Sequence, residues 1–386
     1  MLPHVKKYFS AHNLTGTDFP YRLHSPGRIN IIGEHTDYTG GLVMPASIDK
    51  GIEFYARPNN QRVFNLHAID LGEASELSLP VTGKTGALWV DYLAGIIAQY
   101  QELGHRLPGM DVYFGGNVPR GSGMSSSAAL EGGMAFLINE ALGAGFSRPE
   151  LAQLCQRSSN NFIGVPSGIM DQFASLNGTA AGPIKLNCDT LEFTPVTANL
   201  PGYSWILVNS MVTHELGSSE YPVRVRECSE ALAAINADTA DVPGLSLATS
   251  GQLEAAKDRL SATVYRRAQY VISEKARVHA MEQALGRGDA AAAGVLLNAT
   301  HAGLRDDYEV SCAEVDFLQS EAVTNFPDVV AGSRIMGGGF GGCTINLVKT
   351  AGLPALKNHL LAKYYEAHNQ RPEFYAVNIG PGTRMI

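Results

Sequence analysis

The feature that most constrains this chain is a glycine- and serine-rich stretch at residues 115–131, Gly-Gly-Asn-Val-Pro-Arg-Gly-Ser-Gly-Met-Ser-Ser-Ser-Ala-Ala-Leu-Glu. The residues before it, 110–114, are apolar at every second position and predict a short strand. The residues after it carry Leu130, Met134 and Leu137 at helical spacing and predict a helix over 128–142. The serines at its end stand where a helix N-cap belongs. The stretch therefore predicts a loop that joins a strand to a helix N-terminus.

A loop of this kind is suited to bind an anion. Free backbone N–H groups and the positive end of the helix dipole converge at a helix N-terminus, and glycines let a phosphate approach the backbone. No Gly-Lys-Ser/Thr sequence follows, so the loop is not a Walker A motif. A serine-capped helix after a tight turn would have the same composition. The loop alone leaves phosphate binding and a purely structural turn as alternatives.

The composition of the 386-residue chain excludes several classes of protein. A formal net charge of −8 without a basic run argues against nucleic acid as a partner. No apolar run approaches the roughly 20 residues that span a membrane, and the N-terminus lacks the apolar segment of a signal peptide. The five cysteines are scattered and lack Cys-x-x-Cys spacing, which is typical of free thiols in a reducing compartment. We expect a cytoplasmic globular protein without membrane association and, at this length, two domains.

A polar cluster follows an apolar stretch near the N-terminus. Glu34, His35 and Asp37 come directly after Ile31-Ile32-Gly33 and before a pair of glycines. Carboxylates accept hydrogen bonds and a histidine donates or accepts them, which suits the hydroxyl groups of a sugar. A metal site is the weaker alternative, because no second histidine lies nearby. The cluster predicts a sugar-binding segment.

Asp171 is the only carboxylate between Glu150 and Asp189, and apolar residues flank it. A buried carboxylate needs a partner, and Arg28, behind a predicted Pro-Gly turn, is a candidate. Two interpretations stay open. Asp171 is either a residue of a first helical turn, favoured there by the helix dipole, or a general base held ionised by a cation.

Two further features concern ligand contact. Residues 337–342 supply five glycines in six positions between two predicted strands. A plain hairpin turn needs only one or two, so this density predicts a backbone close to a ligand. Trp89, at the start of a predicted helix over 89–103, is either a core residue or a residue that stacks on an adenine.

Three of these stretches together resemble the GHMP kinase superfamily and, within it, the galactokinase family. Residues 27–38 are similar to the galactokinase signature, residues 119–128 to the superfamily's phosphate loop, and residues 337–342 to its third motif. The resemblance extends over nearly the whole chain, through residues 168–172, 218–224 and 305–309. It implies an α/β fold of the α+β type with two domains, 1–195 and 196–386, and an active site between them.

The resemblance implies an ATP-dependent kinase that phosphorylates the anomeric hydroxyl of galactose to give galactose 1-phosphate. Asp171 would be the base or hydrogen-bond acceptor for that hydroxyl, and Arg28 would hold Asp171 ionised and offset charge on the phosphoryl group. The residues in contact with the sugar would be Glu34, His35, Asp37, Gly168 and Tyr221. Those in contact with ATP would be Gly121, Ser122, Gly123, Met124, Ser125, Ser126, Ser127, Ala128 and Trp89. Such a site works mainly by positioning and charge neutralisation.

The resemblance also implies Mg²⁺, held by the hydroxyl of Ser127 or, alternatively, of Ser126. The chain departs from the family at one important position. A magnesium-binding glutamate is usual twelve residues before Asp171, where this sequence has Ser159 and no carboxylate within 156–162. A serine hydroxyl is a poor direct ligand, so we expect a metal held mainly by ATP, waters and a loop hydroxyl.

Two other functions stay open from the sequence. The same chemistry could serve a related sugar such as N-acetylgalactosamine or arabinose, because the residues around the 2-position are not identified. The missing glutamate would also fit a sensor that binds galactose and ATP without turnover, whereas Arg28, Asp171 and the intact serine loop favour an enzyme. We expect a monomer with galactose and ATP as its partners.

Overall fold

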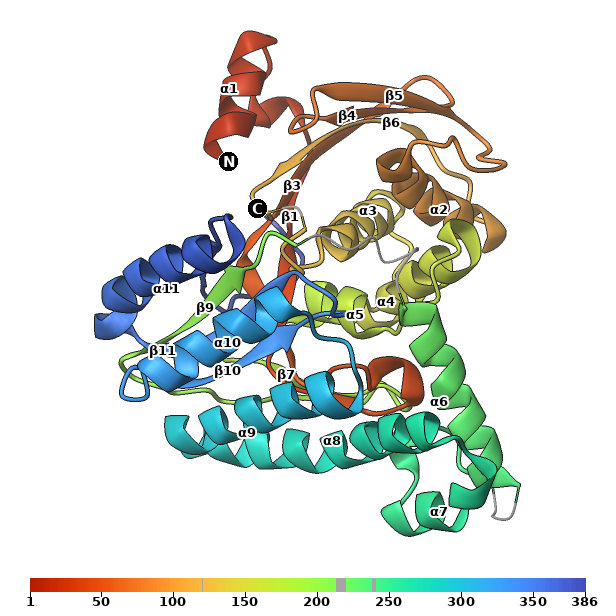
Figure 1. Cartoon of the computed structure of the whole chain (residues 1–386). Helices are drawn as coiled ribbons and strands as arrows, with labels where there is room; N and C mark the ends of the chain where they lie inside the picture. The colour runs from red at the N-terminus through yellow and green to blue at the C-terminus, as the bar shows by residue number, and fades with distance from the viewer. Residues whose placement is uncertain (120, 213–219, 238–240) are drawn as a thin grey trace.

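The chain forms two layered halves, each built on a β-sheet (Figure 1). The computed structural model describes residues 1–119, 121–212, 220–237 and 241–386. Helices and strands occur in both halves, so the predicted α/β class of the α+β type is confirmed. Among the helices of the described ranges, none is long and apolar enough to cross a membrane. Arg120, Ser218 and Ser219, which belong to the segments similar to the family, lie outside the described residues.

The sheet of the first half has the strand order β13-β1-β3-β6-β4-β5. Its strands are β1 (Tyr21–Asn30), β3 (Pro45–Asn59), β4 (Val63–Ala68), β5 (Glu73–Ser78), β6 (Gly109–Gly116) and β13 (Arg384–Met385). Neighbouring strands are antiparallel except β4 and β6, which are parallel. The chain reaches β6 from β5 through helix α2 (Leu88–Glu102). The strand predicted at 110–114 is therefore the middle of β6.

Helices cover both faces of this sheet. One face is covered by four helices: α2, α3 (Ser126–Leu142), α4 (Arg148–Arg157) and α5 (Met170–Asn177). They pack on strand residues such as Phe54 and Phe114. Helix α1 (Pro3–Ala11) covers the other face, where Phe9 contacts Tyr55 and Tyr113 edge to face. This division follows from the alternation of side chains along a strand.

The sheet of the second half is antiparallel throughout, in the order β10-β11-β9-β12. Its strands are β9 (Tyr203–Asn209), β10 (Val330–Met336), β11 (Cys343–Lys349) and β12 (Glu373–Val377). Ile206 and Val208 of β9 pack against α10 (Ala313–Asn325) and α11 (Leu353–His368). Trp205 and Leu207 belong to the core with α8 (Ala262–Gly286) and α9 (Ala290–Ala302). The remaining elements are β2 (Leu42–Val43), β7 (Ile184–Asn187), β8 (Phe193–Pro195), α6 (Tyr221–Asn236) and α7 (Ser250–Ala255).

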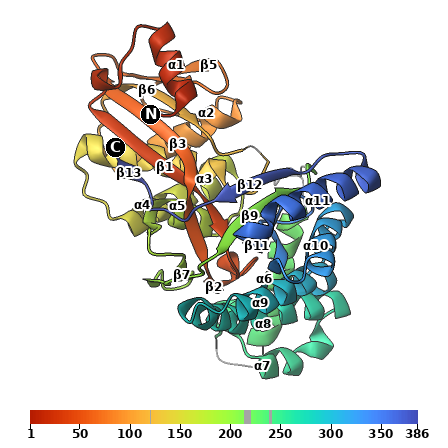
Figure 2. The same ribbon diagram turned by 90° about the vertical axis from the view of Figure 1, so that its left-hand side faces the viewer.

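Segments of each half pack within the other. Ile31 and Ile32, which follow β1, are fully buried in the core of the second half. In the opposite direction, the C-terminal strand β13 returns to pair with β1, and Figure 2 shows the two side by side. The division into domains 1–195 and 196–386 stays a prediction. Residues of the first range pack in the core of the second half, and a strand from the second range pairs with a strand of the first half.

The local structure differs from the sequence-based expectation at two places that matter for the site. Pro26-Gly27 is not a turn: β1 continues through it with a bulge, so that Arg28 lies within the strand. The sequence also predicts one helix over 148–162, whereas α4 ends at Arg157 and the chain continues as a π-helical turn, Ser158–Ile163. Such turns are frequent at functional sites, and this one carries Ser159 to the cavity described below.

Helix α9 packs unusually close to β10, the strand that carries Arg334. A Cβ atom added at Gly294 would lie 1.8 Å from the carbonyl oxygen of Ala331. We therefore expect Gly294→Ala to force the two elements apart and lower the free energy of unfolding by about 1–3 kcal/mol. Gly286→Ala is the matched control, since no atom lies within 4 Å of its added Cβ, and it should be neutral or stabilise by up to about 1 kcal/mol. Urea unfolding that found the two variants equally stable would contradict the close packing.

Candidate active site

A cavity of about 300 Å³ lies where the phosphate loop, the polar cluster, the segment around Asp171 and the glycine run meet. The structure brings nearly all of the predicted site residues to it. Those that line it are Arg28, Glu34, His35, Asp37, Gly121, Ser122, Gly123, Met124, Ser125, Ser126, Ser127, Ser159, Gly168, Asp171 and Tyr221. Glycines 337, 338, 339, 341 and 342 close one side.

Arg28 and Asp171 form the predicted pair. Arg28 Nε and Nη2 donate to Asp171 Oδ1 and Oδ2, both at 2.7 Å. The side chain of Arg28 is only 6% exposed, whereas that of Asp171 is 30% exposed and faces the cavity. Burial alone would lower the pKa of Arg28, but the charge and hydrogen bonds of Asp171 outweigh it and the pKa is raised. The guanidinium therefore stays charged, and Asp171 is both the first-turn residue of α5 and the carboxylate of an ion pair.

The phosphate loop is tied to this pair. Arg28 Nη1 donates to the carbonyl oxygen of Gly123, and Arg28 N donates to the carbonyl oxygen of Met124 at 3.0 Å. Ser125 precedes α3 with a left-handed φ of 54°. Its hydroxyl makes no capping hydrogen bond, contrary to expectation, and donates to Asp171 Oδ2 at 2.8 Å. The N–H groups of the first turn of α3 thus lack a capping side chain at its N-terminus and face a cavity suited to phosphate.

Glu34 is fixed by a residue from the other half of the molecule. Its Oε1 accepts hydrogen bonds from Arg334 Nη1 at 3.0 Å and from Gly337 N at 2.9 Å. Arg334 is fully buried in β10 and also donates to the carbonyl oxygens of Asn30 and Ile31, at 2.5 and 2.8 Å. A buried ion pair with its remaining donors satisfied holds one orientation. Arg334 therefore sets the direction of the Glu34 carboxylate.

His35 is neutral, and a chain of hydroxyl groups orients its ring. Burial lowers the pKa of His35 to about 4. Its Nδ1 is 2.9 Å from the hydroxyl of Tyr38, which lies 2.7 Å from the hydroxyl of Tyr308. Nε2 of His35 is buried and has no hydrogen-bond partner of good geometry among the described residues, although the backbone of Gly338 is close enough to raise the pKa of the ring. His35 lines the cavity, and Nε2 is the ring nitrogen that Tyr38 does not contact.

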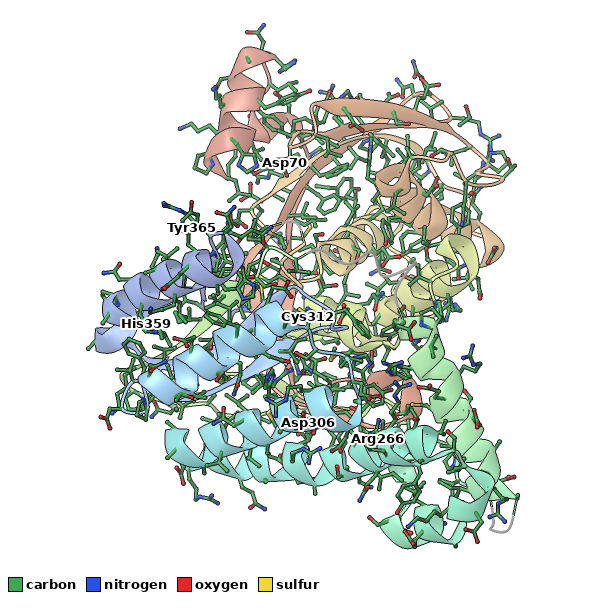
Figure 3. All side chains as sticks on the ribbon, viewed as in Figure 1. Asp70, Arg266, Asp306, Cys312, His359 and Tyr365 are labelled. Atoms are coloured by element: carbon green, nitrogen blue, oxygen red, sulfur yellow. The ribbon has the colours of Figure 1, made fainter. Side chains whose placement is uncertain are left out.

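The ring of Tyr308 lies 4.9 Å from that of His35, and α8 contacts the residues on either side of Tyr308. Arg266 Nε donates to the carbonyl oxygen of Asp307 at 3.4 Å. Arg266 of α8 forms an ion pair with Glu309 at 2.9 Å. Figure 3 shows Arg266 on α8 and Asp306 on the π-helical turn Gly303–Asp307. Residues 305–309, which resemble the family, thus position Tyr308 next to His35 of the polar cluster.

Asp37 and Gly168 are in close contact at the edge of the cavity. A Cβ atom at residue 168 would lie 1.9 Å from Asp37 Oδ2, so only glycine fits there. The ring of Tyr221 stands 5.6 Å from that of His35 and completes this part of the wall. Burial, and then the charges of Asp171 and Glu34, raise the pKa of Asp37 to about 7.

A carboxylate that the sequence analysis did not identify lies beside Ser159. The Ser159 hydroxyl donates to Glu131 Oε1 at 2.8 Å and approaches Oε2 at 3.0 Å. Gln172 Nε2 is 3.4 Å from Glu131 Oε2. Burial raises the pKa of Glu131 to about 8. Residues 156–162 hold no carboxylate, but a carboxyl group of α3 contacts Ser159.

The oxygen groups fit a magnesium ion that enters with a nucleotide. The hydroxyls of Ser126, Ser127 and Ser159 belong to residues that line the cavity. No group of three or more His, Cys, Asp or Glu residues that could hold a metal occurs among the described residues. Mg²⁺ bound together with phosphate oxygens needs only one or two protein ligands. The donor set therefore suits a metal carried by ATP.

Two predicted ATP contacts lie away from the cavity lining. Trp89 packs 5.8 Å from the ring of Phe114, and its Nε1 donates to Glu73 at 2.7 Å. Ala128 is buried inside α3. Trp89 therefore packs as a core residue, which was one of its two interpretations. Contact of Trp89 and Ala128 with ATP stays a prediction.

The comparison with known proteins agrees with this geometry. The family model of the galactokinase galactose-binding signature matches residues 13–58, and that of the GHMP kinases N terminal domain matches residues 91–179. The galactokinase of Thermotoga maritima is 37% identical over 95% of this chain and 100% of that protein. The human galactokinase is 37% identical over 96% of this chain and 93% of that protein.

Solved structures give the same result. The crystal structure of Lactococcus lactis galactokinase complexed with galactose superposes with a TM-score of 0.93 at 34% identity, covering 99% of both chains. The mevalonate kinase of Methanococcus jannaschii has a TM-score of 0.62 at 15% identity, which shows a shared fold. The fold is thus that of the GHMP kinases. Within this class, the chain belongs to the galactokinase family and is an ATP-dependent kinase.

The protonation of Asp37 gives a test that needs no ligand. Because its pKa is raised in the folded protein, the folded state binds a proton more tightly than the unfolded state, and stability falls as pH rises through the window from about 4 to 7. Asp37→Asn removes this dependence. Between pH 5 and pH 7, we expect the free energy of unfolding of the wild type to fall by about 2 kcal/mol relative to that of the variant. Parallel curves from urea unfolding at each pH would contradict a raised pKa.

Proposed function

We propose that this chain transfers the γ-phosphoryl group of ATP to the anomeric hydroxyl of galactose, giving galactose 1-phosphate. The observation that carries the proposal is the position of Asp171. Arg28 and Ser125 hold its carboxylate between the polar cluster and the phosphate loop, with one edge toward the cavity. Membership of the galactokinase family, and the likeness to a relative solved with galactose, support this sugar.

In this proposal the carboxylate of Asp171 accepts the hydrogen bond, and then the proton, of the attacking hydroxyl. The fixed positive charge of Arg28 lies against this carboxylate and offsets negative charge on the phosphoryl group. Phosphoryl transfer requires little covalent chemistry from the protein, so the rigid placement of these groups supplies most of the acceleration.

The sugar would lie against Glu34, His35 and Asp37. Glu34 has Oε2 left for a hydroxyl because Oε1 is taken by Arg334 and Gly337. His35 offers Nε2, and Asp37 accepts hydrogen bonds once it is ionised. An acceptor that is buried without its hydroxyl costs about 1–3 kcal/mol. This part of the site would therefore select among sugars that differ at one hydroxyl.

The phosphates of ATP would lie between the first turn of α3 and the glycine run. Ser127 or, alternatively, Ser126 would hold Mg²⁺ from the loop side, and Ser159, which also lines the cavity, would not be a direct ligand. When bound, the ion neutralises charge on the phosphate oxygens. Arg28 reaches the same region through the carbonyl of Gly123.

The alternative of a sensor without turnover loses its main support. It depended on the missing glutamate, and the structure places the carboxylate of Glu131 within hydrogen-bond distance of Ser159. Kinases for N-acetylgalactosamine or arabinose differ from this proposal only in the sugar, and kinetics with a panel of sugars separates them.

The free cysteines support a proposal about the cellular compartment. All five cysteines are free, and each is buried or half-buried. Free thiols are typical of a reducing compartment, so we propose that the protein acts in the cytoplasm. We also propose that the protein is a monomer.

Replacement of Asp171 tests the catalytic assignment. We expect Asp171→Asn to remove most turnover, because loss of a general base costs about 10²–10⁴-fold in rate. A coupled assay of ADP release with galactose measures kcat, and calorimetry with galactose shows that the site is intact. Asp189→Asn, an exposed carboxylate outside the cavity, is the matched control. A folded Asp171→Asn variant with kcat within about threefold of the wild type would make Asp171 structural.

A comparison of two sugars tests the substrate. Galactose and glucose differ only at the 4-hydroxyl. We expect galactose to be preferred by at least about tenfold in kcat/KM, because one sugar leaves a buried acceptor unpaired. Asp37→Asn should narrow this preference, whereas Asp189→Asn should not. Equal use of the two sugars by the wild type would refute the galactose assignment.

A further inference from the structure

A buried carboxylate lies behind the wall of the cavity without a cation beside it. Glu131 of α3 is fully buried, and its hydrogen-bond partners are Ser159 and Gln172. Within the described ranges, no Lys, Arg or His lies within ion-pair distance of it. By contrast, Glu34 has Arg334, and the buried Glu274 has Arg277. An isolated buried carboxylate is costly unless a positive charge reaches it.

Both partners of Glu131 line the cavity. Ser159 is 5% exposed and Gln172 is 4% exposed, so each presents only its tip. The amide oxygen of Gln172 is buried and has no hydrogen-bond partner among the described residues. A carboxylate, a hydroxyl and an unpaired amide oxygen thus meet at one place. Oxygen ligands of this kind are those that Mg²⁺ prefers.

We propose that Glu131 is a positioning residue for the Mg²⁺ that enters with ATP, and that it supplies from α3 the carboxyl group that residue 159 lacks. Its carboxylate acts through the Ser159 hydroxyl and the Gln172 amide, which separate it from the cavity. The inference rests on the proposed function, because that function brings the metal nucleotide to this wall. It also explains the departure at residue 159, since a serine leaves room for the Glu131 carboxylate to reach the wall.

The first experiment measures metal binding without turnover. The probe is Mn²⁺ with ADP, and the loss of the electron paramagnetic resonance signal of free Mn²⁺ gives the Kd of the metal in the ternary complex. Glu131→Gln keeps the size of the side chain and one acceptor oxygen for the Ser159 hydroxyl, and it replaces the other carboxyl oxygen by an amide group. We expect it to raise that Kd about tenfold or more, as changes behind metal ligands usually do. The Kd of ADP measured in EDTA should not change.

Ser158→Ala is the matched control. This serine is fully buried, as its neighbour Ser159 nearly is, and its hydroxyl has no hydrogen-bond partner among the described residues. It should leave the Kd of Mn²⁺ at the wild-type value. A folded Glu131→Gln variant with wild-type Mn²⁺ affinity would overturn the inference.

A second variant moves the carboxylate instead of deleting it. The double substitution Glu131→Gln with Ser159→Glu keeps one carboxylate and an amide donor in contact. We expect its Kd for Mn²⁺ to return to within about threefold of the wild type, a full recovery of a loss of this size. If Glu131→Gln alone does not fold, the double variant is the test, and a folded double variant that binds Mn²⁺ about tenfold more weakly than wild type refutes the inference.

The two proposals fail in different ways. A wild-type chain that binds no nucleotide, or does not phosphorylate galactose, would refute the proposed function. A wild-type chain that phosphorylates galactose, with Mn²⁺ binding that is insensitive to Glu131→Gln, would refute only the role of Glu131.

Discussion

The site depends first on the ion pair between Arg28 and Asp171. Arg28 lies in β1, Asp171 in the first turn of α5, and the carbonyl that Arg28 also binds belongs to the phosphate loop. Two parallel N–H···O bonds of 2.7 Å fix both position and orientation, as a single contact could not. The pair therefore joins a strand, a helix and a loop around one carboxylate. The hydroxyl of Ser125 donates to the same carboxylate instead of capping α3, and this hydrogen bond is a second link between the loop and α5.

The cavity gathers carboxylates whose charges are compensated to different degrees. Glu34 and Asp171 have arginine partners and stay available as acceptors. Among the described residues, Asp37 and Glu131 form no ion pair, and burial raises the pKa of each. A carboxyl group that is buried without an ion pair is costly, so hydrogen bonds from sugar hydroxyls and the charge of a metal nucleotide would lower that cost. Because several carboxyl groups lie close together, the positions of Arg28 and Arg334 determine which of them form an ion pair.

Much of the fold and of the site could be predicted from local pattern. The strand before the glycine-serine loop, the helix after it and the residues of the polar cluster all lie where their sequence indicates. Three important residues were not identified as part of the site. Arg334 and Tyr308 act on a segment some 300 and 270 positions away in the chain. Glu131 was hidden because it stands inside an apolar helix, and its partner Ser159 lies on a π-helical turn that no periodicity predicts.

What the sequence by itself determined is which chemical groups are present and which stretches carry them: a helix N-terminus with serines, a cluster of side chains suited to sugar hydroxyls, and a lone aspartate with an arginine available. These follow from short-range preferences of the backbone and from side-chain chemistry. Tertiary structure alone decided which groups share a partner. It gave Glu34 its arginine from β10, turned Ser125 toward Asp171 and placed Glu131 behind Ser159. Such pairings depend on distances between elements that are remote in the chain, and only the packing of both halves sets those distances.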